Sequence, residues 1–178
     1  MTSELRLVFD AMCLNHFSRI DRLDVLGHQL VDCSCTTTEF VRAELREGLA
    51  HHPEIAAALE ADWVEVDQLD TVEALMTFER WASRIGSGTR DIGEASVFAA
   101  AQLNSAIAIT DDGAATKVAR KHGLEVHGTL WLLARSCRLG KMGTGEVSTL
   151  IEMLADSGMR LPCTGPEFAG WARKHKLL

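Results

Sequence analysis

Short apolar runs alternate with longer amphipathic segments along this chain. The runs LRLVF at 5–9 and AIAI at 106–109 have the length and apolar character of buried strands. Other segments, such as 71–85, carry apolar residues at helical spacing along one face. We predict strands at 5–9, 30–35, 63–66, 106–109 and 124–126, and helices at 11–20, 23–30, 36–48, 53–61, 71–85, 94–104, 114–122, 129–139, 146–157 and 166–174.

Local signals mark the ends of several predicted helices. Thr36 and Glu39 have the spacing of a capping box, and Gly48 follows the apolar stripe of the same helix. Pro53 lies near the first turn of the next helix. The segment 94–104 is rich in alanine and apolar almost all round, so we expect this helix to be buried.

The order of these elements predicts the fold class. Strands alternate with helices, which favours a mainly parallel central sheet with helices on both faces, a three-layer α/β/α fold. We place this domain at residues 1–139. The glycine-containing segment 140–145 leads into two further helices, which we expect to form a C-terminal appendage at 140–178 packed on the same domain.

Composition fits one folded domain. A length of 178 residues with 47% apolar residues supports a sizeable core and excludes disordered or low-complexity classes. The net charge of −7 repels nucleic acid, so any such binding needs a local basic patch or bridging metal ions. The sequence has no 18-residue apolar span and no N-terminal signal pattern. Five cysteines without framework spacing indicate reduced thiols and a cytoplasmic protein.

Two other kinds of site receive little support from the sequence. Cys33 and Cys35 share one face of a strand, and a metal site there would need two more soft ligands, for which His51 and His52 are the candidates. We favour buried thiols because no second cysteine pair is present. The absence of a GxxxxGK[ST] motif argues against ATP-dependent chemistry.

Acidic residues gather where the carboxyl ends of the parallel strands should meet. Asp10 follows the first strand, where it could also cap the next helix, and an Asp-Asp pair follows the strand at 106–109. Glu94 opens the helix predicted at 94–104, with Asp91 three residues before it, and Glu44 lies two turns into the helix after the second strand. The acids that we expect at this edge are Asp10, Glu44, Asp91, Glu94, Asp111 and Asp112.

Such a cluster predicts a bound cation. Two like charges about 4 Å apart repel by roughly 4 kcal/mol at an effective dielectric constant of about 20. The cluster therefore has to be protonated, paired with basic residues or neutralised by an ion. Oxygen ligands favour Mg²⁺ and Mn²⁺. Such an ion beside a phosphodiester activates water and stabilises charge on the attacking and leaving oxygens.

The sequence resembles a known family. The segments LVFDAMCLNHF, TTTEFVRAEL, DIGEASVFAAA and the strand–Asp–Asp–helix–strand–Gly-Thr-helix segment from 106 to 140 follow one another in the order seen in PIN-domain nucleases. Among these, the chain is similar to the VapC-like ribonuclease toxins of type II toxin–antitoxin systems. The resemblance covers residues 5–139. It departs from the family pattern at Asp111, where the family often has a basic residue.

This resemblance implies an endoribonuclease that depends on Mg²⁺ or Mn²⁺ and cleaves RNA phosphodiesters. It also implies a small antitoxin partner and a homodimer. The residues that would carry the activity are Asp10, Glu44, Glu94 and Asp112 as catalytic acids and metal ligands, with Asp91 and Asp111 as second-tier ligands. Thr110 is either an accessory group that holds a metal-bound water or only the end of the strand.

Structural explanations remain open for the same acids. Asp91 fits a helix cap, Glu94 suits the positive end of a helix dipole, and Glu44 could pair with neighbouring arginines. Of Asp111 and Asp112, we expect one to cap the following helix and the other to be a ligand.

Alternative functions are a non-catalytic module whose acidic pocket binds a basic partner, and a housekeeping PIN-type nuclease. A phospho-acceptor is disfavoured because Asp10 lacks Asp-x-Asp spacing. Basic side chains near the acids would contact RNA phosphates, although each singly is explained slightly better by a solvated helix face. These residues are Arg42, Arg46, Arg90, Lys117, Arg120 and Lys121.

Overall fold

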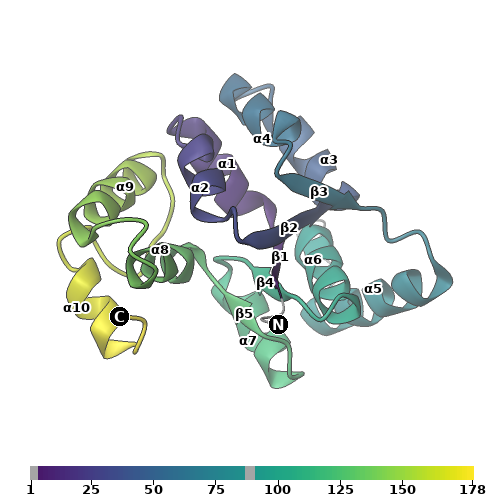
Figure 1. Cartoon of the computed structure of the whole chain (residues 1–178). Helices are drawn as coiled ribbons and strands as arrows, with labels where there is room; N and C mark the ends of the chain where they lie inside the picture. The colour runs from purple at the N-terminus through teal and green to yellow at the C-terminus, as the bar shows by residue number, and fades with distance from the viewer. Residues whose placement is uncertain (1–3, 87–90) are drawn as a thin grey trace.

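The computed structural model describes residues 4–86 and 91–178 and has a three-layer α/β architecture (Figure 1). Its sheet has five strands in the order β3–β2–β1–β4–β5, and every neighbouring pair is parallel. This confirms the predicted fold class. The strands are β1 (Leu5–Phe9), β2 (Cys33–Thr38), β3 (Val64–Asp67), β4 (Ile107–Ile109) and β5 (Val126–His127).

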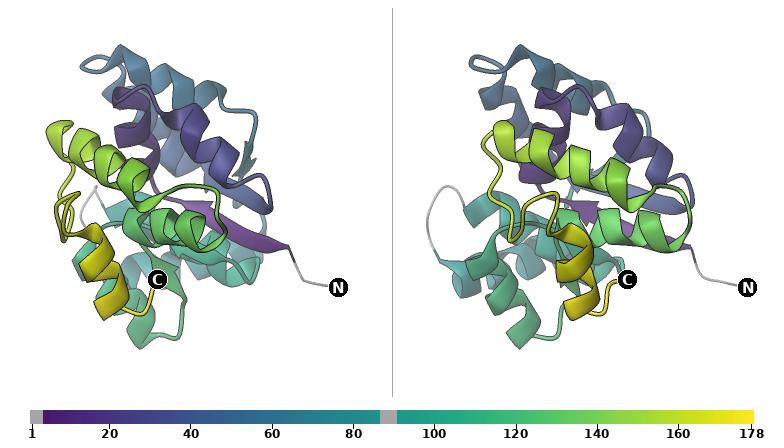
Figure 2. Two further views of the ribbon diagram at one scale, coloured as in Figure 1. Left: turned by 60° about the vertical axis from the view of Figure 1, so that its left-hand side comes forward. Right: turned by 90° about the vertical axis from the view of Figure 1, so that its left-hand side faces the viewer.

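Helices cover both faces of the sheet (Figure 2). They are α1 (Ala11–Arg19), α2 (Leu23–Gln29), α3 (Glu39–Gly48), the 3-10 turn η1 (Pro53–Ile55), α4 (Ala56–Glu60), α5 (Val72–Ile85), α6 (Asp91–Leu103), α7 (Gly113–Lys121), α8 (Thr129–Arg138), α9 (Thr144–Asp156) and α10 (Phe168–Lys174). In Figure 2, α1, α2 and α9 lie on one side of the sheet, and α5, α6 and α7 lie on the other.

The core is centred on β1, β4 and α6. Residues 7–9 of β1 are fully buried, and so is the run from Ala95 to Ala101 in α6. Because alanine side chains are short, α6 packs closely against β1, β2 and α5. The predicted buried helix is confirmed, and its packing fixes the first turn of α6 beside the carboxyl ends of the central strands.

The boundary between β2 and α3 differs from the prediction. The three threonines that were expected to open the helix belong to the strand, where Thr36 pairs with Val8 and with Glu65. The helix cap is Thr38, whose Oγ1 accepts a hydrogen bond from the Val41 amide at 3.2 Å. The predicted capping box at Thr36 was therefore wrong, because β-branched residues paired on both sides stay extended.

The ends of other helices also differ slightly from the predicted ones. The predicted helix 53–61 is divided between η1 and α4, and α9 begins two residues before the predicted start. Asp91 is the first residue of α6, so it lies within the helix and is not its cap.

The C-terminal helices pack on the rest of the chain. In α9 and α10, Val147, Ile151 and Phe168 are fully buried. The predicted division between residues 139 and 140 stays a prediction. Among the described residues, no helix has both the length and the apolar character that a membrane span requires.

Candidate active site at the carboxyl edge of the sheet

Asp10 stands at the end of β1 and is almost completely buried, with 3% of its surface exposed. Its backbone amide bonds to the Ile109 carbonyl at 2.9 Å, which ties the ends of β1 and β4 together. The Thr110 hydroxyl donates to Asp10 Oδ2 at 3.3 Å. Burial raises the pKa of Asp10 to about 6, although hydrogen bonds from neighbouring amides and from Thr110 oppose this rise.

Glu94 lies in the first turn of α6 and is half-buried. Its Oε2 atom is buried and has no hydrogen-bond partner among the described residues. Burial raises the pKa of Glu94 to about 8, and the charges of Asp10, Glu44 and Asp112 raise it further. A buried carboxylate oxygen without a partner costs free energy, so this group favours a proton or a cation.

Glu44 reaches the same place from α3, which lies at the carboxyl end of β2. A side chain added at Gly93 would place its Cβ 2.9 Å from Glu44 Oε2 and 3.7 Å from Asp10 Oδ1. The bare backbone of Gly93 therefore makes room for two carboxylates. Asp10, Glu44 and Glu94 line one cavity of about 220 Å³.

A buried hydroxyl chain fixes α3 against α6. The Ser96 hydroxyl donates to the Gly93 carbonyl at 2.6 Å, and its oxygen lies 2.6 Å from Thr38 Oγ1. Thr38 in turn caps α3. This chain of contacts joins the segment that carries Glu44 to the one that carries Glu94.

Asp111 and Asp112, which follow β4, both accept hydrogen bonds that stabilise the local fold. Asp112 caps α7, because its Oδ1 accepts from the Ala115 amide at 2.7 Å. Asp111 accepts from the Thr129 amide at 2.9 Å and from the Thr129 hydroxyl at 2.7 Å. Their charges still reach the site, because Asp112 raises the pKa of Glu94 and Asp111 raises that of Asp10.

A family match extends over most of the chain. A model of the PIN domain (DUF3368) matches residues 6–164, a range that contains Asp10, Glu44, Glu94 and Asp112. The chain belongs to the PIN-domain family. No curated protein matches it. PIN domains are generally nucleases and typically use divalent metal ions.

The acidic edge of this PIN domain fits such an ion through its donor chemistry. No group of three or more Asp, Glu, His or Cys side chains is arranged to hold a metal within the described part of the chain. Mg²⁺, however, is usually held by one or two carboxylates and keeps several waters. The unpartnered Glu94 Oε2 and the buried Asp10 carboxylate fit that mode of binding.

The sequence drew attention to His16 and Arg19 as a departure from the family pattern but assigned no role to the polar residues of α1 that complete this cavity. Asn15, His16 and Arg19 line it together with the acids. His16 Nδ1 lies 2.7 Å from Ser157 Oγ, whose proton goes to the Leu154 carbonyl at 2.6 Å, so the imidazole donates at Nδ1. Helical spacing from residue 12 to residue 19 could have found this face.

Several remaining candidates have other contacts. Arg42 donates to the Leu59 carbonyl at 3.1 Å, and Arg46 pairs with Glu39 at 2.6 Å. Lys117 and Lys121 are exposed on α7. Asp91 lies beside Gly86, because a Cβ added at Gly86 would be 3.4 Å from Asp91 Oδ2. Arg90 lies outside the described residues. Their proposed roles in binding RNA or metal stay predictions.

Proposed function

We propose that this PIN domain is a metal-dependent endoribonuclease whose acids are Asp10, Glu44, Glu94 and Asp112. One observation carries the proposal. Glu94 presents a buried, unpartnered oxygen in a cavity that it shares with Asp10 and Glu44. Oxygen donors of this kind select Mg²⁺ or Mn²⁺.

The side chains around Asp10 have separate tasks in this proposal. Asp10 and Glu94 would hold the ion, and Thr110 keeps the Asp10 carboxylate oriented by donating to Oδ2. Gly93 leaves room for the Glu44 carboxylate. When bound, the ion would activate water for attack on the phosphodiester and stabilise the charge that develops on its oxygens.

The α1 residues extend this assignment. Arg19 brings a cation into an otherwise acidic cavity, where it suits a phosphate of the substrate. His16 is neutral at pH 7, because burial and the charges of Arg19 and His52 lower its pKa to about 4. With Nδ1 donating to Ser157, Nε2 is left as a hydrogen-bond acceptor.

A narrower role follows from the resemblance to VapC-like toxins. In that role the chain is the ribonuclease of a toxin–antitoxin pair in the cytoplasm, acts as a homodimer and is inhibited by a small antitoxin. A housekeeping PIN-type nuclease is the alternative. Co-purification of the chain with the product of an adjacent small reading frame, and loss of cleavage in that complex, would support the toxin role.

Substitution of the two buried acids tests the activity. We expect Asp10→Asn and Glu94→Gln to lower the rate of cleavage of a labelled single-stranded RNA in Mn²⁺ by at least about 100-fold, because each removes a ligand charge. Both variants should keep the far-ultraviolet circular dichroism of the wild type. The control is Asp24→Asn, which changes an exposed acid on α2. Full activity of either variant, or of the wild type in EDTA, would contradict the proposed metal mechanism, whereas absence of Mn²⁺ binding in calorimetry would favour the non-catalytic module.

A further inference from the structure

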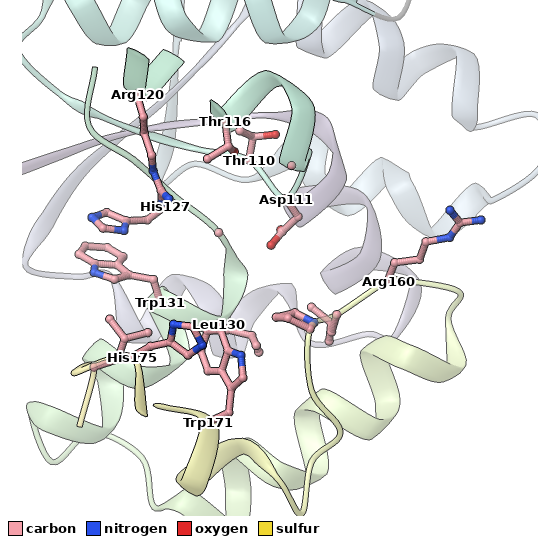
Figure 3. A pocket seen from close by; sticks show the side chains of 15 residues that line it. Thr110, Asp111, Thr116, Arg120, His127, Leu130, Trp131, Arg160, Trp171 and His175 are labelled. Atoms are coloured by element: carbon pink, nitrogen blue, oxygen red, sulfur yellow. The ribbon is translucent and has the colours of Figure 1, made fainter. Parts of the chain in front are cut away.

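A second and larger cavity lies between the end of the sheet and the C-terminal segment (Figure 3). Its volume is about 650 Å³, within the range of small-molecule sites and three times that of the acidic cavity. One wall comes from β5 and α8, and the other from the chain around α10. Asp10, Glu44 and Glu94, which line the acidic cavity, do not line this one.

Two pairs of flat rings line the cavity. His127 and Trp131 stack with centroids 4.3 Å apart and planes 4° from parallel. From the opposite wall, Trp171 and His175 lie one helical turn apart with centroids 4.5 Å apart. Figure 3 shows both pairs on the border of the same space. Aromatic rings at the walls of an open cavity are suited to stacking on an unpaired nucleobase.

The charges around the cavity favour a phosphate. Arg120 and Arg160 both line it, and Arg120 is positioned by donating to the Val126 carbonyl at 2.7 Å. In the lining that the structure describes, Asp111 is the one carboxylate, and both of its oxygens accept hydrogen bonds from Thr129. The lining thus has more basic than acidic side chains, whereas the whole chain has a net charge of −7.

The cavity adjoins the acidic site through the segment that follows β4. Thr110 lines the cavity, and its hydroxyl donates to Asp10 Oδ2 in the acidic site. Asp111 also lines the cavity and raises the pKa of Asp10. A chain of nucleotides whose phosphodiester reaches Asp10 can therefore place a neighbouring nucleotide in the cavity.

We propose that this cavity binds one unpaired nucleotide of the RNA substrate, with its base against Trp131 and Trp171 and its phosphate near Arg120. The assignment of RNA as the ligand rests on the proposed ribonuclease function. A paired base has its faces covered by its neighbours in the helix, so the site selects single-stranded RNA.

The test compares two probes of equal charge without any cleavage. The probes are a fluorescein-labelled ten-nucleotide oligoadenylate and an abasic ribose-phosphate oligomer of the same length. Their dissociation constants are measured by fluorescence anisotropy with the full chain in EDTA. We expect the wild type to bind the oligoadenylate about tenfold more tightly, because each stacked base contributes on that scale.

Variants assign this preference to the cavity. Trp171→Ala and Trp131→Ala should bind both probes equally, whereas Trp171→Phe should keep most of the preference because it retains a ring. The matched control is Phe40→Ala, which removes another exposed ring, one that stacks on Phe78 between α3 and α5, two helices that do not line this cavity. Arg120→Gln should weaken both probes equally and lower the salt dependence by about one unit.

The outcomes separate this proposal from the nuclease assignment. Equal binding of both probes by the wild type would overturn the nucleotide site, as would an unchanged preference in the alanine variants. An unchanged affinity in Arg120→Gln would contradict the assigned phosphate contact. A preserved base preference in a chain that never cleaves RNA would support the cavity and contradict the nuclease function.

Discussion

The acids at the edge of the sheet differ in what surrounds each carboxylate. Asp10 and Glu94 are held where burial raises their pKa values, to about 6 and about 8. Asp111 and Asp112 instead accept hydrogen bonds from the backbone amides of Thr129 and Ala115. Residues of one chemical type thus divide into groups that favour a cation and groups that hold the backbone, because their partners differ.

The histidine beside these acids gives a prediction on pH. The pKa of His16 is lowered from its ordinary 6.5 to about 4 by burial and by the charges of Arg19 and His52. Between these two pH values the unfolded chain binds this proton and the folded chain does not, so the contribution of His16 to stability falls as pH falls from 6.5 towards 4. Asp10 and Glu94 act in the opposite direction, because their raised pKa values let the folded chain take up protons first, so the His16 contribution is measured against a variant without the imidazole.

The matched variant is His16→Gln, which keeps a donor for Ser157 and removes the titration. Relative to the wild type, its melting temperature should rise by a few degrees as pH falls over the same range. Identical pH profiles for the two proteins, measured by differential scanning fluorimetry, would show that His16 is not held neutral by the fold.

At the scale of elements, the site depends on the first turn of α6. This turn brings Gly93 against the carboxylates of Glu44 and Asp10, and it carries Glu94 itself. The helix is held there by its buried alanines and by the Ser96 contact to Thr38. The mostly apolar helix α6 therefore positions the carboxylates of the acidic site.

Gly93→Ala is expected to separate activity from stability. The new Cβ would displace the flexible end of Glu44, which is an exposed side chain, so the fold should tolerate the change. Alanine also favours a helix by up to about 1 kcal/mol over glycine. Cleavage should fall by about 10- to 100-fold, because a displaced catalytic group costs this much.

The control for this helix is Gly145→Ala in α9, where an added Cβ meets no atom within 4 Å. This variant should cleave RNA at the wild-type rate. Rates and urea unfolding midpoints measured on both variants check the prediction. A Gly93→Ala protein with full activity would show that the position of Glu44 does not matter.

At the scale of the whole molecule, the C-terminal segment contributes to both cavities. Ser157, which follows α9, fixes the imidazole of His16 in the acidic cavity. Trp171 of α10 forms a wall of the larger cavity. The Arg138 guanidinium bonds to the Leu177 carbonyl at 2.6 Å and ties the chain end to α8. The last helices are thus part of the surface that would meet a substrate.

A metal ion should stabilise the whole fold if the acids hold it. At an Mn²⁺ concentration of about 100 times the dissociation constant, binding adds about 2.7 kcal/mol to the free energy of unfolding. For a chain of this length, that corresponds to a rise in melting temperature of roughly 5–10 °C. Asp24→Asn should show the same rise, and Asp10→Asn should show little or none. An equal rise in Asp10→Asn would place the ion elsewhere.

Much of the architecture could be predicted from local patterns. The runs at 5–9 and 106–109 form the central strands, and the alanine-rich segment forms the buried helix. The error at the start of α3 arose because the spacing of Thr36 and Glu39 is a local signal. Pairing of Thr36 with residues 28 positions before it and 29 positions after it decided the strand instead.

The sequence by itself determined the alternation of strands and helices and the presence of acids after the strands, because periodicity and residue type are local properties. Only the tertiary structure decided which oxygens are satisfied. Asp111 is bound by a threonine 18 residues away, whereas Glu94 Oε2 is buried without a partner among the described residues. Burial and hydrogen bonding depend on which distant segments meet, and so do the aromatic walls that Trp131 and Trp171 bring together.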